Sequence, residues 1–220
     1  AAREAGVGRA GLGRKLPAAA YALAAHSGSG DAYSFCMCPG GQVVCTSTDP
    51  AELCVNGMSF SKRASRWANS GLVVPVGAED CAPFVDRPSD APMAGLALQR
   101  AVERDAAARG GGALVAPVQA MTDFAEGRAS PGHALPSSSY RLGVRAARLD
   151  EVYPARVTGA LRAGLEQFDR KMPGYLSPLG LLHGVESRTS APVRLPRDPG
   201  TMQSTTLPGL YPAGEGGGFA

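Results

Sequence analysis

The feature that most limits the fold is one apolar stripe between residues 154 and 172. Apolar side chains recur there at spacings of four, four, three and four residues, at Val157, Leu161, Leu165, Phe168 and Met172. This period places them on a single face of a helix. We therefore predict a helix from about Pro154 to Lys171, ended by Pro173-Gly174. A helix of this kind buries its apolar face against another layer, which the rest of the chain has to supply.

Short strands are expected before this helix. Three β-prone runs are separated by turn-forming residues: Tyr33-Ser34-Phe35, Gln42-Val43-Val44 and Gly71-Leu72-Val73-Val74. Pro39-Gly40-Gly41 predicts a hairpin between the first two runs. A second main helix is expected from Leu96 to Ala108, with Gly110-Gly111-Gly112 as its stop. Strands and helices together predict a domain of mixed α and β structure.

The remaining segments give weaker local patterns. Ala18 to Ala25 is helix-prone and follows Pro17, which suits a first helical turn. The polar stretch from Ala116 to Tyr140 predicts a long excursion over the surface, and Leu207 to Pro212 predicts a final short strand. No apolar run approaches the roughly 18 residues of a membrane span, so we expect a soluble protein.

Charge and cysteine content argue against two kinds of site. Lys and Arg number 22 against 19 Asp and Glu, which leaves a net charge of +3. Nucleic-acid-binding domains concentrate a larger basic excess, so no nucleic-acid partner is expected. The odd number of cysteines, without a secretory signal, indicates reduced thiols inside the cell. No Cys-x-x-Cys pair or intervening histidine marks a zinc site among Cys36, Cys38, Cys45, Cys54 and Cys81.

Two glycine clusters are candidates for binding a nucleotide. Gly6-Val7-Gly8-Arg9-Ala10-Gly11 has the spacing of a dinucleotide-binding turn, and Asp31 lies about twenty residues later. No strand precedes this cluster, and Pro17 interrupts the helix that would have to come after it, which argues against that role. The second cluster, Gly214 to Gly218 with Glu215, suits either a turn that approaches a ligand or a flexible glycine segment.

A compact polar group lies at Glu186-Ser187-Arg188-Thr189-Ser190, with Arg194 nearby. Arginine pairs bidentately with carboxylate or phosphate, so this group could hold an anionic or carbonyl substrate. The alternative is a solvated strand edge with a surface ion pair. His183 precedes the group and could act as a general acid or base, or be structural.

Several motifs together resemble a known family. They are Tyr33-Ser34-Phe35-Cys36-Met37-Cys38-Pro39-Gly40-Gly41, then Asn56-Gly57-Met58-Ser59, Arg63, Ala68-Asn69-Ser70, Gly184 to Arg194, Met202-Gln203-Ser204 and Gly209 to Gly216. The pattern resembles the FAD-dependent dehydrogenases of bacteria and plastid-bearing organisms, from about residue 12 to residue 220. The resemblance implies an α/β flavoprotein of the glutathione-reductase type, α+β in its inserted part. This chain would be its substrate-side and C-terminal portion without the N-terminal Rossmann half.

The resemblance implies three parts and a set of site residues. Residues 1–32 are expected to be a lead-in with a short helix, 33–195 an inserted substrate-side domain, and 196–220 a truncated return to the FAD-binding domain. Contact with the flavin is expected from Gly214, Glu215, Gly216 and Gly217. The substrate side of the flavin ring is expected to be lined by Cys36, Cys38, Arg63, Asn69, Glu186, Arg188 and Arg194.

The implied function is that of an FAD-dependent oxidoreductase acting on a small molecule, with NAD(P)H as a candidate reductant. If Tyr33 to Met37 is a strand, Cys36 and Cys38 share one face of it. A redox pair of these two thiols is not favoured, because a bridge across one residue closes a strained ring. The plastid stroma is the implied compartment, with the cytoplasm as the alternative. The rival function is a non-catalytic protein-interaction domain without a cofactor.

Overall fold

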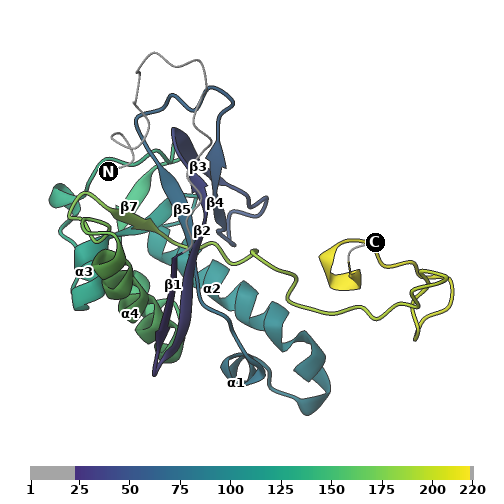
Figure 1. The fold of residues 1–220 in the computed structure, drawn as a ribbon. Helices are drawn as coiled ribbons and strands as arrows, with labels where there is room; N and C mark the ends of the chain where they lie inside the picture. The colour runs from purple at the N-terminus through teal and green to yellow at the C-terminus, as the bar shows by residue number, and fades with distance from the viewer. Residues whose placement is uncertain (1–22, 219–220) are drawn as a thin grey trace.

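The computed structural model describes residues 23–218 and contains three small sheets and two long helices (Figure 1). The helices are α1 (Ala78–Cys81), α2 (Ala94–Gly110), α3 (Met121–Glu126) and α4 (Ala155–Lys171), with short 3-10 turns between them. The strands are β1 (Leu23–Ser27), β2 (Gly30–Cys38), β3 (Gly41–Cys45), β4 (Val55–Ser59), β5 (Asn69–Val73), β6 (Ala116–Ala120), β7 (Val144–Ala146) and β8 (Leu181–His183). The mixture confirms the predicted α/β class.

The three sheets differ in their pairing. One is antiparallel with the order β1-β2-β5, and β3 and β4 form a separate antiparallel pair. In the third, β6 lies between β7, which runs parallel to it, and β8, which runs antiparallel. All five residues of β6 are buried. β6 is therefore the buried central strand of the half of the domain that comes after α2.

The predicted helix at residues 154–171 is confirmed as α4, which contributes side chains to two buried clusters. Val157, Leu161 and Leu165 are buried with residues of α2 such as Leu98. Phe168 is fully buried in a second cluster with the inward-facing side chains of β1 and β2. Figure 1 shows α4 alongside the β1–β2 ribbon, with α2 on the other side of the molecule. The stripe therefore belongs to both buried clusters, one shared with α2 and one with the first sheet.

Four local predictions are wrong in the described residues. Residues 23–25 of the expected helix Ala18–Ala25 belong to β1, because Leu23 and Ala25 alternate inward onto Phe168. The expected hairpin does not pair, since β2 and β3 lie in different sheets. Residues 116–126 of the expected surface excursion form β6 and α3. Residues 207–212 form no strand. The remaining residues of the first helix, 18–22, lie outside the described part.

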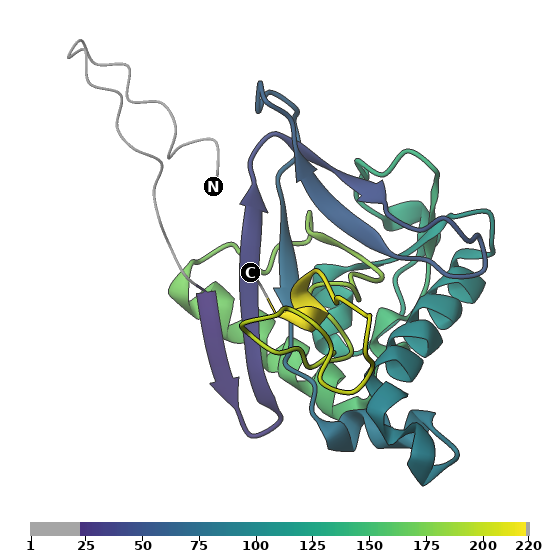
Figure 2. The ribbon, with the colours of Figure 1, turned by 90° about the vertical axis from the view of Figure 1, so that its right-hand side faces the viewer.

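The predicted helix from Leu96 to Ala108 is confirmed as α2. It ends at Gly110, and Gly111 caps it with a φ of 91°, a conformation that glycine adopts without steric cost. After β8 the chain leaves the core, and residues 195–218 form an arm on one side of the body (Figures 1 and 2). None of the helices within residues 23–218 is long and apolar enough to cross a membrane.

Candidate functional site

A bulge in β2 separates the two neighbouring cysteines. Phe35 pairs with Gly71 and Cys38 pairs with Asn69, so β2 carries one more residue than β5 between these pairs. Cys36 takes up the extra residue with a φ of 50°. Bulges of this kind redirect side chains. Cys36 is exposed and Cys38 is half-buried, so the alternation on which a shared face depended is broken.

Three of the sequence motifs meet at the amide of Asn69. A Cβ placed on Gly57 would lie 1.9 Å from Asn69 Oδ1, and one placed on Gly41 would lie 2.8 Å from Asn69 Nδ2. Both amide atoms are buried and have no hydrogen-bond partner within the described residues. An unpaired buried polar group costs about 1–3 kcal/mol, so its retention calls for an explanation. The glycines of β3 and β4 make the space that this amide occupies.

The turn between β2 and β3 requires glycine at residue 40. Gly40 has a φ of 62°, and a Cβ there would lie 2.1 Å from the backbone oxygen of Arg63. Arg63 itself has a φ of 45° and an exposed side chain. The close approach of these two backbones holds the segment around Arg63 beside Cys38.

Cys38, Arg63, Asn69 and Glu186 line one partly open cavity of about 1450 Å³ between the sheets and helices. The sequence places these four residues far apart, and the structure brings them to one cavity. Their place on the substrate side of a flavin stays a prediction. Burial raises the pKa of Glu186. Burial also raises the pKa of the Cys38 thiol, and the nearby Cys36 adds to the rise while Arg63 opposes it. At neutral pH Cys38 therefore keeps its proton.

Arg188 lies outside this cavity and forms a buried ion pair. Its Nε and Nη2 atoms lie 2.9 and 2.7 Å from the two carboxylate oxygens of Glu103 on α2. Glu103 is 1% exposed. Burial alone would raise the pKa of Glu103, but hydrogen bonds from Arg188 and Ser187 outweigh it and lower that pKa. The structure thus gives Arg188 a role in holding the segment after β8 against α2.

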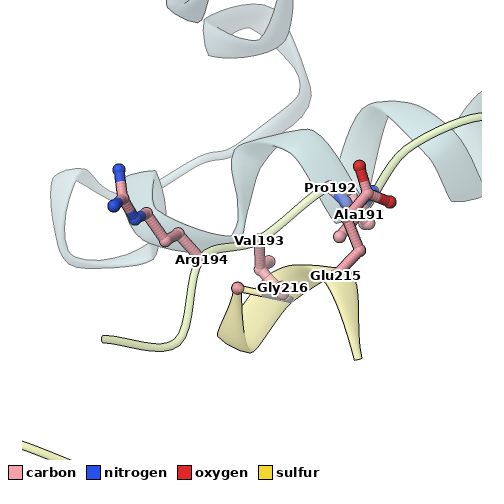
Figure 3. A pocket seen from close by; sticks show the side chains of 7 residues that line it. Ala191, Pro192, Val193, Arg194, Glu215 and Gly216 are labelled. Atoms are coloured by element: carbon pink, nitrogen blue, oxygen red, sulfur yellow. The ribbon is translucent and has the colours of Figure 1, made fainter. Parts of the chain in front are cut away.

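Arg194 and Glu215 line a second, shallower pocket of about 430 Å³ (Figure 3). Glu215 Oε2 accepts a hydrogen bond of 2.8 Å from the backbone N–H of Ala191. The N–H of Leu195 donates to the carbonyl of Gly216 at 2.7 Å. In Figure 3 the Arg194 side chain extends away from Glu215. The residues predicted for the substrate side are therefore divided, since Arg194 shares this pocket with Glu215 while four others line the larger cavity.

The glycines of the second cluster have two kinds of surroundings. A Cβ on Gly216 or Gly217 would come within 3.0 Å of backbone oxygens of Val193 and Pro212, respectively. Those two glycines are needed for the turn's own packing. Gly214 and Gly218 have positive φ values and no heavy atom within 4 Å of a Cβ position, so the turn is open at both ends. The first glycine cluster, residues 6–11, lies outside the described residues.

The structure adds Ser138 and Tyr153 to the cavity, and it places His183 there with them. Ser138 Oγ lies 2.7 Å from His183 Nε2. The polar, serine-rich pattern around Ser138 predicts only surface structure, and one tyrosine before Pro154 carries no signal of its own. All five cysteines are free, and no group of three or more metal-ligating side chains forms in residues 23–218.

The fold and the cavity define a mixed α/β domain with one large, mostly apolar cavity. Comparison with known proteins is more specific. The model of the family described as "FAD-dependent protein, C-terminal domain-like" matches residues 7–189, and the chain belongs to that family. An uncharacterized protein from Clostridium beijerinckii (strain ATCC 51743 / NCIMB 8052) is 43% identical over 210 residues. The match covers 94% of this chain and 38% of that relative's length.

Proposed function

We propose that the chain is the substrate-side and C-terminal portion of an FAD-dependent oxidoreductase, a dehydrogenase of the glutathione-reductase type. The family supports FAD dependence of the protein as a whole. The observation that carries the proposal is the convergence of Cys38, Arg63, Asn69 and Glu186 on one cavity. A mostly apolar cavity with a few convergent polar groups is the usual form of a small-molecule site.

The turn at Gly214–Gly218 fits the sugar-alcohol chain of FAD. Its outer ends are open where Gly214 and Gly218 lack a Cβ. Glu215 uses Oε2 to hold Ala191, while Oε1 has no hydrogen-bond partner within residues 23–218. A carboxylate oxygen of this kind accepts a hydrogen bond from a hydroxyl group. FAD, when bound, supplies hydride transfer.

The chain's own residues would bind and orient the substrate. Cys38 offers a protonated thiol, and burial raises the pKa of Glu186, which favours the protonated form of its carboxyl. Arg63 is the cation of this group and suits a carboxylate or carbonyl oxygen. The partly buried Glu186 lies among apolar walls, where electrostatic interactions are stronger than in water. NAD(P)H as reductant and the plastid stroma as compartment belong to the same proposal.

The test is the absorption spectrum of protein purified from the complete reading frame, beside this 220-residue chain. The long form is expected to be yellow. Glu215→Ala is expected to weaken its FAD binding about tenfold, since one hydrogen bond to a charged group is lost. Glu215→Gln keeps an acceptor for Ala191, and Glu166→Ala, on the exposed face of α4, is the control. A colourless long form that takes up no added FAD would contradict the proposal.

A second candidate, a protein-interaction domain, is favoured by the arm. Leu195, Leu207, Leu210 and Tyr211 are all more than 40% exposed there. Clustered exposed apolar side chains mark contact surfaces. A colourless long form that binds another protein through this arm would favour this candidate over the flavoprotein.

A further inference from the structure

The large cavity is lined mainly by apolar side chains from elements that are far apart in the sequence. Leu98 and Val102 come from α2, Val157 and Leu161 from α4, and Leu72 from β5. Its volume of about 1450 Å³ exceeds the roughly 300–1000 Å³ that is typical of small-molecule sites. A ligand here gains free energy chiefly by burying apolar surface.

One polar pair in the cavity lies outside the seven residues predicted for the substrate side. Ser138 Oγ and His183 Nε2 are 2.7 Å apart. The other ring nitrogen, Nδ1, lies 3.2 Å from the carbonyl oxygen of Leu181. A carbonyl only accepts, so Nδ1 carries the hydrogen and Nε2 of the neutral ring is an acceptor. Burial lowers the pKa of His183 to about 4, which keeps the ring neutral at neutral pH.

The hydrogen bonds of Ser138 define what it can still bind. Its one hydrogen is donated to His183 Nε2, because that nitrogen has none to give. Its oxygen accepts a bond of 3.0 Å from the backbone N–H of Tyr140. A hydroxyl oxygen has two lone pairs, so one remains for a ligand. Ser138 is therefore set to accept from a ligand hydroxyl and has nothing to donate to a ligand carbonyl.

We propose that this cavity binds a largely apolar small molecule that carries a hydroxyl group, and that Ser138 accepts the hydrogen bond of that hydroxyl. His183 is a positioning residue, since it fixes the direction of the Ser138 hydroxyl. The designation of this molecule as the substrate rests on the proposed function. The binding site itself requires only the cavity and the Ser138–His183 pair.

The test measures binding of two fluorescent probes to the chain without added FAD. The probes are 2-naphthol, which donates a hydrogen bond, and 2-methoxynaphthalene, which has the same ring system and oxygen but no hydrogen to donate. The wild-type chain is expected to bind 2-naphthol about fivefold more tightly, as one net hydrogen bond of about 1 kcal/mol predicts. Ser138→Ala is expected to bind the two probes about equally tightly.

Two further variants separate the hydrogen bond from the fold. Ser137→Ala removes the neighbouring hydroxyl on the same loop and is expected to keep the fivefold preference. His183→Phe is expected to reduce it, because the Ser138 hydroxyl is then free to turn. Binding of 2-methoxynaphthalene, unchanged within about twofold in every variant, shows that the cavity is intact.

Two results would overturn the inference. If neither probe binds the wild-type chain, the cavity is not an apolar ligand site. If Ser138→Ala binds 2-methoxynaphthalene normally and keeps the fivefold preference, the hydroxyl is bound elsewhere. Neither result bears on FAD uptake, and a colourless full-length protein would leave this site standing, so the two proposals fail separately.

Discussion

Replacing Arg188 by alanine is expected to destabilise the chain, because it leaves the Glu103 carboxylate buried without its cation. Loss of one partner of a buried ion pair costs about 3–5 kcal/mol. The Arg188 side chain is 46% exposed, and Ser187 still donates to Glu103. These two facts reduce the expected loss to about 2–3 kcal/mol, a large part of the roughly 5–15 kcal/mol that stabilises a typical domain.

The loss of stability in Arg188→Ala is expected to depend on pH. Because the folded-state pKa of Glu103 is below 4.5, the stabilisation from the ion pair is present above pH 4.5 and is lost as the pH falls through the folded pKa. In Arg188→Ala, burial is left to raise the Glu103 pKa, so the carboxyl takes up a proton readily in acid. The deficit of the variant is therefore expected to be larger at pH 7 than at pH 4.

The measurement is urea unfolding followed by circular dichroism at both pH values. Arg104→Ala is the matched control, since Arg104 pairs with Glu52 at the surface and its side chain is 62% exposed. That change is expected to cost at most about 1 kcal/mol. The reasoning would be refuted if the two variants lost equal free energy of unfolding. It would also be refuted if the deficit of Arg188→Ala grew toward pH 4.

Three other changes test the fold. Gly40→Ala is expected to lower the free energy of unfolding by more than about 2 kcal/mol in urea, because its Cβ would meet the Arg63 carbonyl at a positive φ. An unchanged free energy would contradict this close approach at the turn. Leu165→Ala is expected to lower the free energy of unfolding by about 3–5 kcal/mol. Leu179→Ala, at an 83% exposed site, is expected to lower it by under about 0.5 kcal/mol. Equal losses in the two variants would contradict the burial of α4. Wild-type stability is expected to fall from about pH 6.5 toward 4 as unfolded His183 gains a proton; His183→Gln should fall less, and parallel curves would contradict this.

The long helices were predictable because their information is local. The stripe of α4 repeats along the whole helix, and the glycines after α2 end it where expected. The strand β1 was not predictable in this way, because Leu23-Ala24-Ala25 favours a helix locally. Its inward face is instead fixed by Phe168, a contact between residues far apart in the sequence. Tertiary packing overrides propensity in such short segments.

The candidate site was predictable in part, and through motifs rather than periodicity. The motifs that contain Cys38, Asn69 and Glu186 meet in space. Arg188 does not line the cavity with them, because it pairs with Glu103. In the sequence, Glu103 looks like any exposed charged residue on a helix. Its burial depends on the packing of α2 against the segment after β8. No pattern of spacing encodes that contact.

The packing of α4 on the β1–β2 ribbon has a consequence during synthesis. His26 on β1 hydrogen-bonds Gln167 on α4, and these residues are 141 positions apart in the chain. Ribosomes add about 5–20 residues per second, so the ribbon waits about 7–28 s for its partner helix to be made. β5 joins β1 and β2 early in this interval, but the three-stranded sheet still lacks the helix that buries its apolar face. Until α4 emerges, the apolar face of the ribbon is open to the binding of chaperones.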